Sequence, residues 1–159
     1  MKITVYCVGR LKEAYWKAAC DEYLKRLSAY AEVVIVEVDD LASKDKAGEA
    51  LEAKVKNEEG AKILAKLKPG DYVCALDLNK KECDSVFFSS HLQEMMVRGG
   101  SAVSFLIGGS LGLSDSLKAR ANESISFSKM TFTHQMSRVI LLEQLYRAFK
   151  IAHHEPYHK

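Results

Sequence analysis

Apolar residues along this chain fall into short β-type runs that are separated by longer segments with helical spacing. Strands are predicted over residues 2–8, 33–38, 71–77, 102–107 and 124–127. Helices are predicted over residues 11–31, 43–68, 85–98 and 134–151. Because strands alternate with helices of this length, the pattern predicts an α/β fold in which helices flank a mostly parallel sheet.

Start and stop signals support several of these elements. The continuous apolar run 33–38 is typical of a strand buried on both faces of a parallel sheet. Ser85 is a plausible N-cap for the helix over 85–98, which Gly99 and Gly100 end. The helix over 134–151 is apolar nearly all round, so its apolar surface is wider than one face packed on the sheet would require. We therefore expect a second copy of the chain to cover it in a symmetric dimer.

Composition adds bounds to this picture. With 159 residues, 48% hydrophobic and 28% charged, the chain is expected to form one domain over residues 1–159. It has no run of 18 apolar residues, so no membrane span is expected. The first residues become charged too early for a signal peptide, and the four cysteines lack CxxC spacing. We expect a cytoplasmic protein with reduced thiols.

Charge is uneven along the chain although the net charge is only +2. Residues 36–59 carry eight acidic side chains and four lysines, a balance of −4, whereas residues 129–159 carry five Lys or Arg and two Glu, a balance of +3. This asymmetry indicates either an anionic partner at the C-terminal end or a solvated basic face. Pro156 breaks the spacing of the three histidines His153, His154 and His158, so no metal site is expected.

A glycine turn (residues 108–112) leaves the strand predicted over 102–107. It lacks the lysine of a phosphate-binding loop and does not form GxGxxG. As G-x-S-x-G it matches a serine-hydrolase elbow, with Asp115 and His134 in the order that a triad needs. An elbow needs a helix directly behind Ser110, however, and Ser114 looks like the true helix start. A cofactor-binding turn and a simple tight turn remain as alternatives.

The segment over residues 127–132 carries two aromatic side chains and a methionine, which is unusual for a loop. Such side chains suit the apolar walls of an adenine or thioether pocket, while the backbone amides bind polar edges. Alternatively, Phe127, Met130 and Phe132 fill the core.

Three segments carry a resemblance to a known family: FLIGGSLGL, SFSKMTFTHQMSRVILLEQLYRAFKI and the final PYHK. With the opening KITVYCVGRLKEAYW, the ALD strand end and the length, they make the whole chain resemble the SPOUT-class 23S rRNA (pseudouridine-N3)-methyltransferase family. The chain departs from the usual pattern at Thr133, Lys80 and His154, where proline, glycine and glycine are usual. None of these three residues is one to which chemistry is assigned.

The resemblance implies a SPOUT-type fold with a C-terminal trefoil knot and S-adenosylmethionine as methyl donor. The cofactor-binding residues that it implies are Leu76, Gly108, Phe127, Ser128, Lys129, Met130, Thr131 and Phe132. It also implies a homodimer that methylates a pseudouridine at N3 in an intersubunit-bridge stem-loop of 23S rRNA, on the assembled 70S ribosome. A small, mildly basic chain lacks the charge to select naked RNA, which agrees with an assembled substrate.

Roles for the C-terminal residues follow from the resemblance and from general chemistry. Because N3 carries a proton at neutral pH, its methylation needs a general base or a cation that stabilises the developing anion. Histidine has the matching ordinary pKa, so His158 is the expected base, with Arg138 as stabiliser and Tyr157 stacked on the target base. Lys159 and Arg147 are expected to bind RNA. These roles require the tail to reach the partner's pocket; a disordered terminus is the alternative.

Two other classes of function remain open. A serine hydrolase would depend on Ser110. A non-catalytic ribosome-binding module would bind ribosomes without using the cofactor loop.

Overall fold

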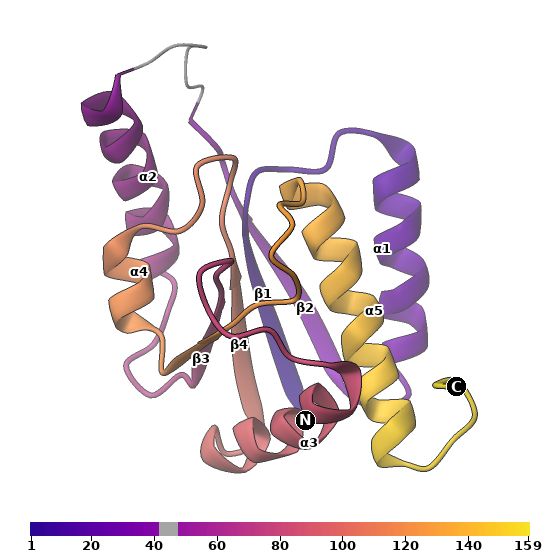
Figure 1. Cartoon of the computed structure of the whole chain (residues 1–159). Coiled ribbons are helices and arrows are strands. Elements are labelled where there is room, and N and C mark those ends of the chain that lie inside the picture. The colour runs from indigo at the N-terminus through magenta and orange to yellow at the C-terminus, as the bar shows by residue number, and fades with distance from the viewer. Residues whose placement is uncertain (42–47) are drawn as a thin grey trace.

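The computed structural model of the chain describes residues 1–41 and 48–159. A five-stranded parallel sheet in the order β2-β1-β4-β3-β5 forms its centre (Figure 1). Its strands are β1 (Lys2–Val8), β2 (Glu32–Val38), β3 (Val73–Leu76), β4 (Ala102–Ile107) and β5 (Glu123–Ile125). The helices are α1 (Ala14–Leu27), α2 (Glu49–Leu64), α3 (Ser85–Arg98), α4 (Asp115–Arg120) and α5 (His134–Ala152). The predicted α/β class is confirmed.

Several predicted ends need correction. The helix predicted over 11–31 is shorter at both ends, and the one predicted over 43–68 runs from Glu49 to Leu64, with residues 43–47 outside the described part. The strand over 71–77 shrinks to four residues, and the strand over 124–127 begins and ends earlier. The N-cap of α3 is Asp84 rather than Ser85, because the Asp84 carboxylate accepts a hydrogen bond from Phe87 N. Asparagine, aspartate and serine cap equally well, so adjacent candidates are hard to separate.

The helices cover both faces of the sheet. On one face, α1, α3 and α5 bury a cluster that includes Phe88, Phe105 and Leu145. On the other face, α2 and α4 bury a smaller cluster around Ile63, Leu106 and Leu117 (Figure 1). Both clusters are continuous with the central strands, so the strands β1 and β4 are apolar on both faces, as parallel sheets require.

Helix α5 lies between α1 and α3, and this placement changes the expectation drawn from its apolar composition. Leu141, Leu142, Leu145, Ala148 and Phe149 are buried within the chain. Met136 is the exposed large apolar residue of α5, at 39%. The surplus apolar surface that suggested a dimer is therefore covered by the chain's own helices, and the homodimer stays a prediction that needs other support.

None of the helices within residues 1–41 and 48–159 combines the length and the hydropathy needed to cross a membrane. Within the same ranges all four cysteines are free thiols, of which Cys7, Cys20 and Cys74 are buried.

Candidate functional site

A cavity of about 740 Å³ lies at the edge of the sheet where β3, β4 and β5 end. Its walls include Leu76 at the end of β3, Ile107 at the end of β4 and Ile125 at the end of β5. Open parallel sheets bind ligands outside the carboxyl ends of their strands. The volume is also within the usual range for small-molecule sites. Fold position and size therefore both indicate a ligand site.

The glycine turn forms one wall of this cavity. Gly112 N donates a hydrogen bond of 3.0 Å to the Gly109 carbonyl, which closes the turn. A Cβ added to Gly108 would lie 2.5 Å from the carbonyl carbon of Gly112 and 2.8 Å from Leu113 N. The turn folds back so closely on position 108 that only glycine fits there, and this fixes the backbone conformation of the cavity wall.

The hydrolase reading of the same turn finds no support. The helix after Ser110 begins only at Asp115, and its N-cap is Ser114, whose Oγ accepts a hydrogen bond of 3.3 Å from Leu117 N. His134 Nδ1 is buried without a hydrogen-bond partner among the described residues, so it does not hold the carboxylate of a triad.

The loop over residues 127–132 forms another part of the cavity wall. Phe127 packs edge-on against Phe88 of the core, with ring centroids 6.2 Å apart. Met130 and Phe132 are 72% and 36% exposed, so they do not fill the core. The loop is held by its own serine, since Ser128 Oγ accepts a hydrogen bond of 3.0 Å from Met130 N.

Most of the expected cofactor residues therefore come together around one cavity. Those that line it are Leu76, Gly108, Phe127, Ser128, Thr131 and Phe132. Lys129 and Met130 do not line it and lie exposed beside it.

The cavity also has polar walls that sequence reasoning missed. Asp77, which is only 8% exposed, ends the ALD motif and pairs with Lys118 Nζ of α4 at 3.3 Å. Lys56 of α2 lines the cavity as well. Asp77 could have been found from its place directly after a buried strand. Lys56 and Lys118 could not, because the sequence does not show which face of their helices points toward the glycine turn.

His134 begins α5 and contributes its ring to the cavity wall. The ring lies against Gly9, where an added Cβ would come within 2.7 Å of His134 Cε1. Gly9 also has φ +93°, a conformation that favours glycine. Burial, and then the charge of Arg138, lower the pKa of His134, so its ring is neutral at neutral pH.

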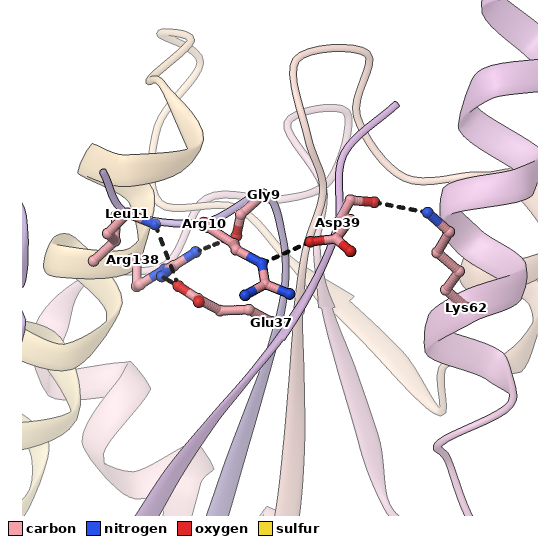
Figure 2. A network of polar contacts seen from close by, with 7 residues as sticks. All are labelled: Gly9, Arg10, Leu11, Glu37, Asp39, Lys62 and Arg138. Atoms are coloured by element: carbon pink, nitrogen blue, oxygen red, sulfur yellow. Dashed lines mark hydrogen bonds and ion pairs between the residues drawn. The ribbon is translucent and has the colours of Figure 1, made fainter. Parts of the chain in front are cut away.

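Arg138 lies one turn further along α5 in a polar network at the ends of β1 and β2 (Figure 2). Its guanidinium pairs with Glu37 and donates a hydrogen bond of 3.0 Å to the Gly9 carbonyl. Glu37 also accepts a hydrogen bond of 3.4 Å from Leu11 N. The Arg138 side chain is 1% exposed and lies outside the main cavity, so its direct contacts are structural.

The tail (residues 153–159) is anchored at two points, to α5 and to Tyr30, which follows α1. At the first, Glu155 accepts hydrogen bonds of 2.5 Å from Lys150 Nζ and 2.6 Å from Tyr30 Oη. Between the helix and this point, His154 takes the left-handed conformation with φ +55°. The first anchor therefore fixes the direction in which the tail leaves the helix.

The second anchor lies at Tyr157, whose hydroxyl donates a hydrogen bond of 3.1 Å to Glu143 Oε1. Arg147 donates to the same oxygen and lies 4.7 Å above the Tyr157 ring. Burial is the main cause that raises the pKa of Tyr157. The exposed His158 follows, with Nδ1 3.4 Å from Arg147 Nη1. The tail is thus folded rather than disordered.

The expected catalytic residues and the cavity lie at opposite ends of α5. The helix has 19 residues and therefore spans about 27 Å from His134 to Ala152. Figure 1 shows the C-terminus at the end of the molecule that lies away from the glycine turn. Within one chain, His158 and Tyr157 do not reach the cavity. Among the described residues, no group of three or more His, Cys, Asp or Glu side chains is placed to hold a metal ion.

Comparison with known proteins places this geometry in a family. The family described as "Predicted SPOUT methyltransferase" matches residues 1–158. Two similar proteins, each called ribosomal RNA large subunit methyltransferase H, come from Clostridium novyi, with 53% identity, and Clostridium acetobutylicum, with 50%. Both alignments cover 159 residues and the whole of each chain.

The fold has a solved counterpart. A protein from Legionella pneumophila, described as a methyltransferase in complex with the bound cofactor SAM, matches with a TM-score of 0.51 and 11% identity. The match covers 96% of this chain but spans only 66% of the other. At that identity the likeness is one of fold alone.

Proposed function

The chain belongs to the SPOUT methyltransferase family, and from this we propose that it methylates large-subunit ribosomal RNA with S-adenosylmethionine as methyl donor. In finer terms, the substrate is N3 of a pseudouridine in an intersubunit-bridge stem-loop of 23S rRNA, on the assembled 70S ribosome. The observation that carries the proposal is the cavity at the ends of β3, β4 and β5, lined by the glycine turn and the 127–132 loop.

The residues around this cavity fit the proposed cofactor. Leu76 and Phe127 supply apolar walls for an adenine ring. The backbone of the glycine turn and the loop around Thr131 offer amides and carbonyls to the polar edges of the cofactor. When bound, S-adenosylmethionine supplies an electrophilic methyl group, so the protein's task is to orient the acceptor and to handle its proton.

The tail supplies the remaining chemistry from a second copy of the chain. Because about 27 Å of helix separates the cavity from the tail, His158 can serve a cavity only in the partner of a homodimer. There His158 accepts the N3 proton and Tyr157 stacks on the base, while Lys159 and Arg147 contact RNA. The two anchors of the tail, at Glu155 and Glu143, preorganise these groups.

Arg138 supports the site indirectly in a single chain. It joins α5 to the ends of β1 and β2 through Glu37 and Gly9, and so fixes the wall that carries His134. Direct stabilisation of the N3 anion would require its guanidinium to leave Glu37. We therefore assign it a positioning role. The trefoil knot implied by the family stays part of the proposal.

The first experiment is a calorimetric titration of the purified protein with S-adenosylmethionine, in which we expect saturable binding with a defined stoichiometry per chain. Gly108→Ala should abolish it, because the added Cβ collides with the returning turn. Gly70→Ala is the matched control, since nothing lies within 4 Å of a Cβ there. Circular dichroism of both variants separates lost binding from lost folding.

Transfer of labelled methyl groups then tests the substrate. We expect 70S ribosomes to be labelled and free 23S rRNA to be labelled much more slowly. Ser110→Ala should leave transfer nearly unchanged. A folded protein that binds ribosomes but neither binds the cofactor nor transfers methyl groups would be a ribosome-binding module, and the proposal would fail.

A further inference from the structure

Three lysines lie directly beside the cavity without lining it. Lys80 and Lys81 follow the lining residue Asn79 in the loop after β3, and Lys129 follows the lining residue Ser128. All three are exposed. We call Lys80, Lys81 and Lys129 the lysine rim.

The two loops that carry the lysine rim are hydrogen-bonded to each other. Ser126 N donates a hydrogen bond of 3.3 Å to the Lys81 carbonyl, and Lys129 N donates one of 2.8 Å to Glu82 Oε1. Cys83 N returns a hydrogen bond of 3.2 Å to the Ser126 carbonyl. The lysines of the rim therefore lie on two loops that are bound to each other, next to the cavity-lining residues Asn79 and Ser128.

Acidic residues near the rim are engaged elsewhere. The Asp77 carboxylate pairs with Lys118, and the Asp84 carboxylate caps α3. Glu82 accepts the backbone hydrogen bond of Lys129. Over residues 1–41 and 48–159, the side chains of Lys80, Lys81 and Lys129 form no ion pair. The rim thus presents three ammonium groups that have no ion-pair partner among the described residues, with the Glu82 carboxylate as a negative charge beside them.

Two cations of helix α5 differ from the lysine rim because they have ion-pair partners. Arg147 is bonded to Glu143, and Lys150 to Glu155. Their charges are largely neutralised, and their side chains are 24% and 17% exposed. The positive charge of these two residues is therefore less available to an anion than a count of charged residues indicates.

We infer that the lysine rim binds backbone phosphates of the RNA strand that presents its base to the cavity. The inference rests on the proposed function and adds to it the side of the site on which the RNA backbone lies. Phosphate contacts by lysine position a nucleic acid without reading its sequence. The copy that holds the cofactor would hold the RNA backbone, while the partner's tail would act on the base.

The test compares two variants that each remove two charges. Lys80→Gln/Lys81→Gln alters the rim. Lys66→Gln/Lys68→Gln alters two exposed lysines between α2 and β3, before the amino end of β3, whereas the cavity lies at its carboxyl end. Methyl transfer to 70S ribosomes is measured from low to moderate salt, with cofactor binding measured by calorimetry. Removing phosphate contacts should weaken binding and flatten its salt dependence.

For the rim variant we expect the KM for ribosomes to rise about tenfold at moderate salt, with kcat nearly unchanged. The slope of log KM against log salt should fall by about one to two. Lys80→Arg/Lys81→Arg should restore both, and the control variant should behave as the unaltered protein. Cofactor binding should stay the same in all four proteins.

Several results would overturn the inference. These are an unchanged KM, an equal rise in the control variant, or a rise without a change in salt slope, which would indicate contact with ribosomal protein. Loss of cofactor binding in the rim variant would also overturn it. If the unaltered protein methylates no ribosomes, the proposed function fails, which is a separate outcome from any difference between variants.

Discussion

The two ends of helix α5 satisfy their polar groups very differently. Four buried side-chain atoms in the described residues lack a hydrogen-bond partner, and three of them lie at the cavity end: His134 Nδ1, Arg138 Nε and Glu59 Oε2. Glu59 belongs there because its Oε2 would lie 3.3 Å from a Cβ on Gly109. At the tail end, Glu143 accepts hydrogen bonds from three side chains and Glu155 from two.

This difference separates two tasks. Buried polar atoms without partners cost stability, and native proteins keep few of them outside functional sites. At the cavity end the unpaired His134 ring lines the cavity and keeps polar capacity for a ligand, whereas the tail end uses its hydrogen bonds to fix its own shape. This division fits the proposed function, in which the chain receives a cofactor at one end and presents a base at the other.

Loss of the exposed tail histidine should have the largest effect. His158→Ala should lower kcat for methyl transfer by about 10²- to 10⁴-fold, because it removes the proposed general base. Stability should not change, since His158 is exposed. His153→Ala, in the same tail but packed on Tyr30, is the control. Single-turnover rates on ribosomes measure both; an equal rate for His158→Ala would remove this assignment.

Removal of one member of the Arg138–Glu37 ion pair, near the cavity end of α5, should destabilise the fold. Arg138→Met should lower the free energy of unfolding by about 3 kcal/mol, because it leaves Glu37 without its buried cation. Urea denaturation measures the change.

Glu37→Met/Arg138→Met should recover much of this loss, since replacing both members of a buried pair is far less costly. A double variant as unstable as the sum of the two single ones would show that the pair is not coupled.

Glu59 gives the cavity end a pH dependence. Burial raises the pKa of its carboxyl group, so its stabilisation is complete below the ordinary pKa of about 4.3 and is lost as the pH rises through the raised value. Glu59→Gln keeps an oxygen for Leu41 N and removes the buried charge. Its stability should match that of the unaltered protein at about pH 4 and be higher at neutral pH. Urea denaturation across this range measures both; a constant difference would contradict the idea.

The smallest expected effect concerns the left-handed residue of the tail. His154→Gly should raise the free energy of unfolding by about 0.5 kcal/mol, because glycine adopts φ +55° without steric cost. Thermal unfolding measures it. His154→Ala serves as the contrast and should not stabilise; a higher melting temperature for Ala than for Gly would show that backbone conformation is not the cause.

The strands β1 and β4 could be predicted to the residue because continuous or alternating apolar runs fix their limits. The limits of β3 and β5 were less well predicted, since flanking residues such as Tyr72 and Asp77 make single backbone hydrogen bonds to neighbouring strands without belonging to β3. The glycine turn and the 127–132 loop were recognisable as a site because unusual residues stand where strands end.

Long-range polar contacts could not be predicted in this way. Arg138 looks like the polar stripe of an apolar helix, but its partner Glu37 is 101 residues away. Likewise, nothing in the local pattern indicates that Tyr157 returns to Glu143, or that Lys56 and Lys118 approach the glycine turn. Such contacts depend on how the sheet brings distant helices together.

The length of α5 has a consequence for how the family can vary. Each residue inserted into an α-helix turns everything beyond it by about 100° and advances it by 1.5 Å. A single insertion between His134 and Ala152 would rotate Tyr157 and His158 away from the direction in which they now leave the molecule. Insertions or deletions in this helix are therefore tolerable chiefly near whole turns, because the length of the helix sets the position of the tail relative to the cavity.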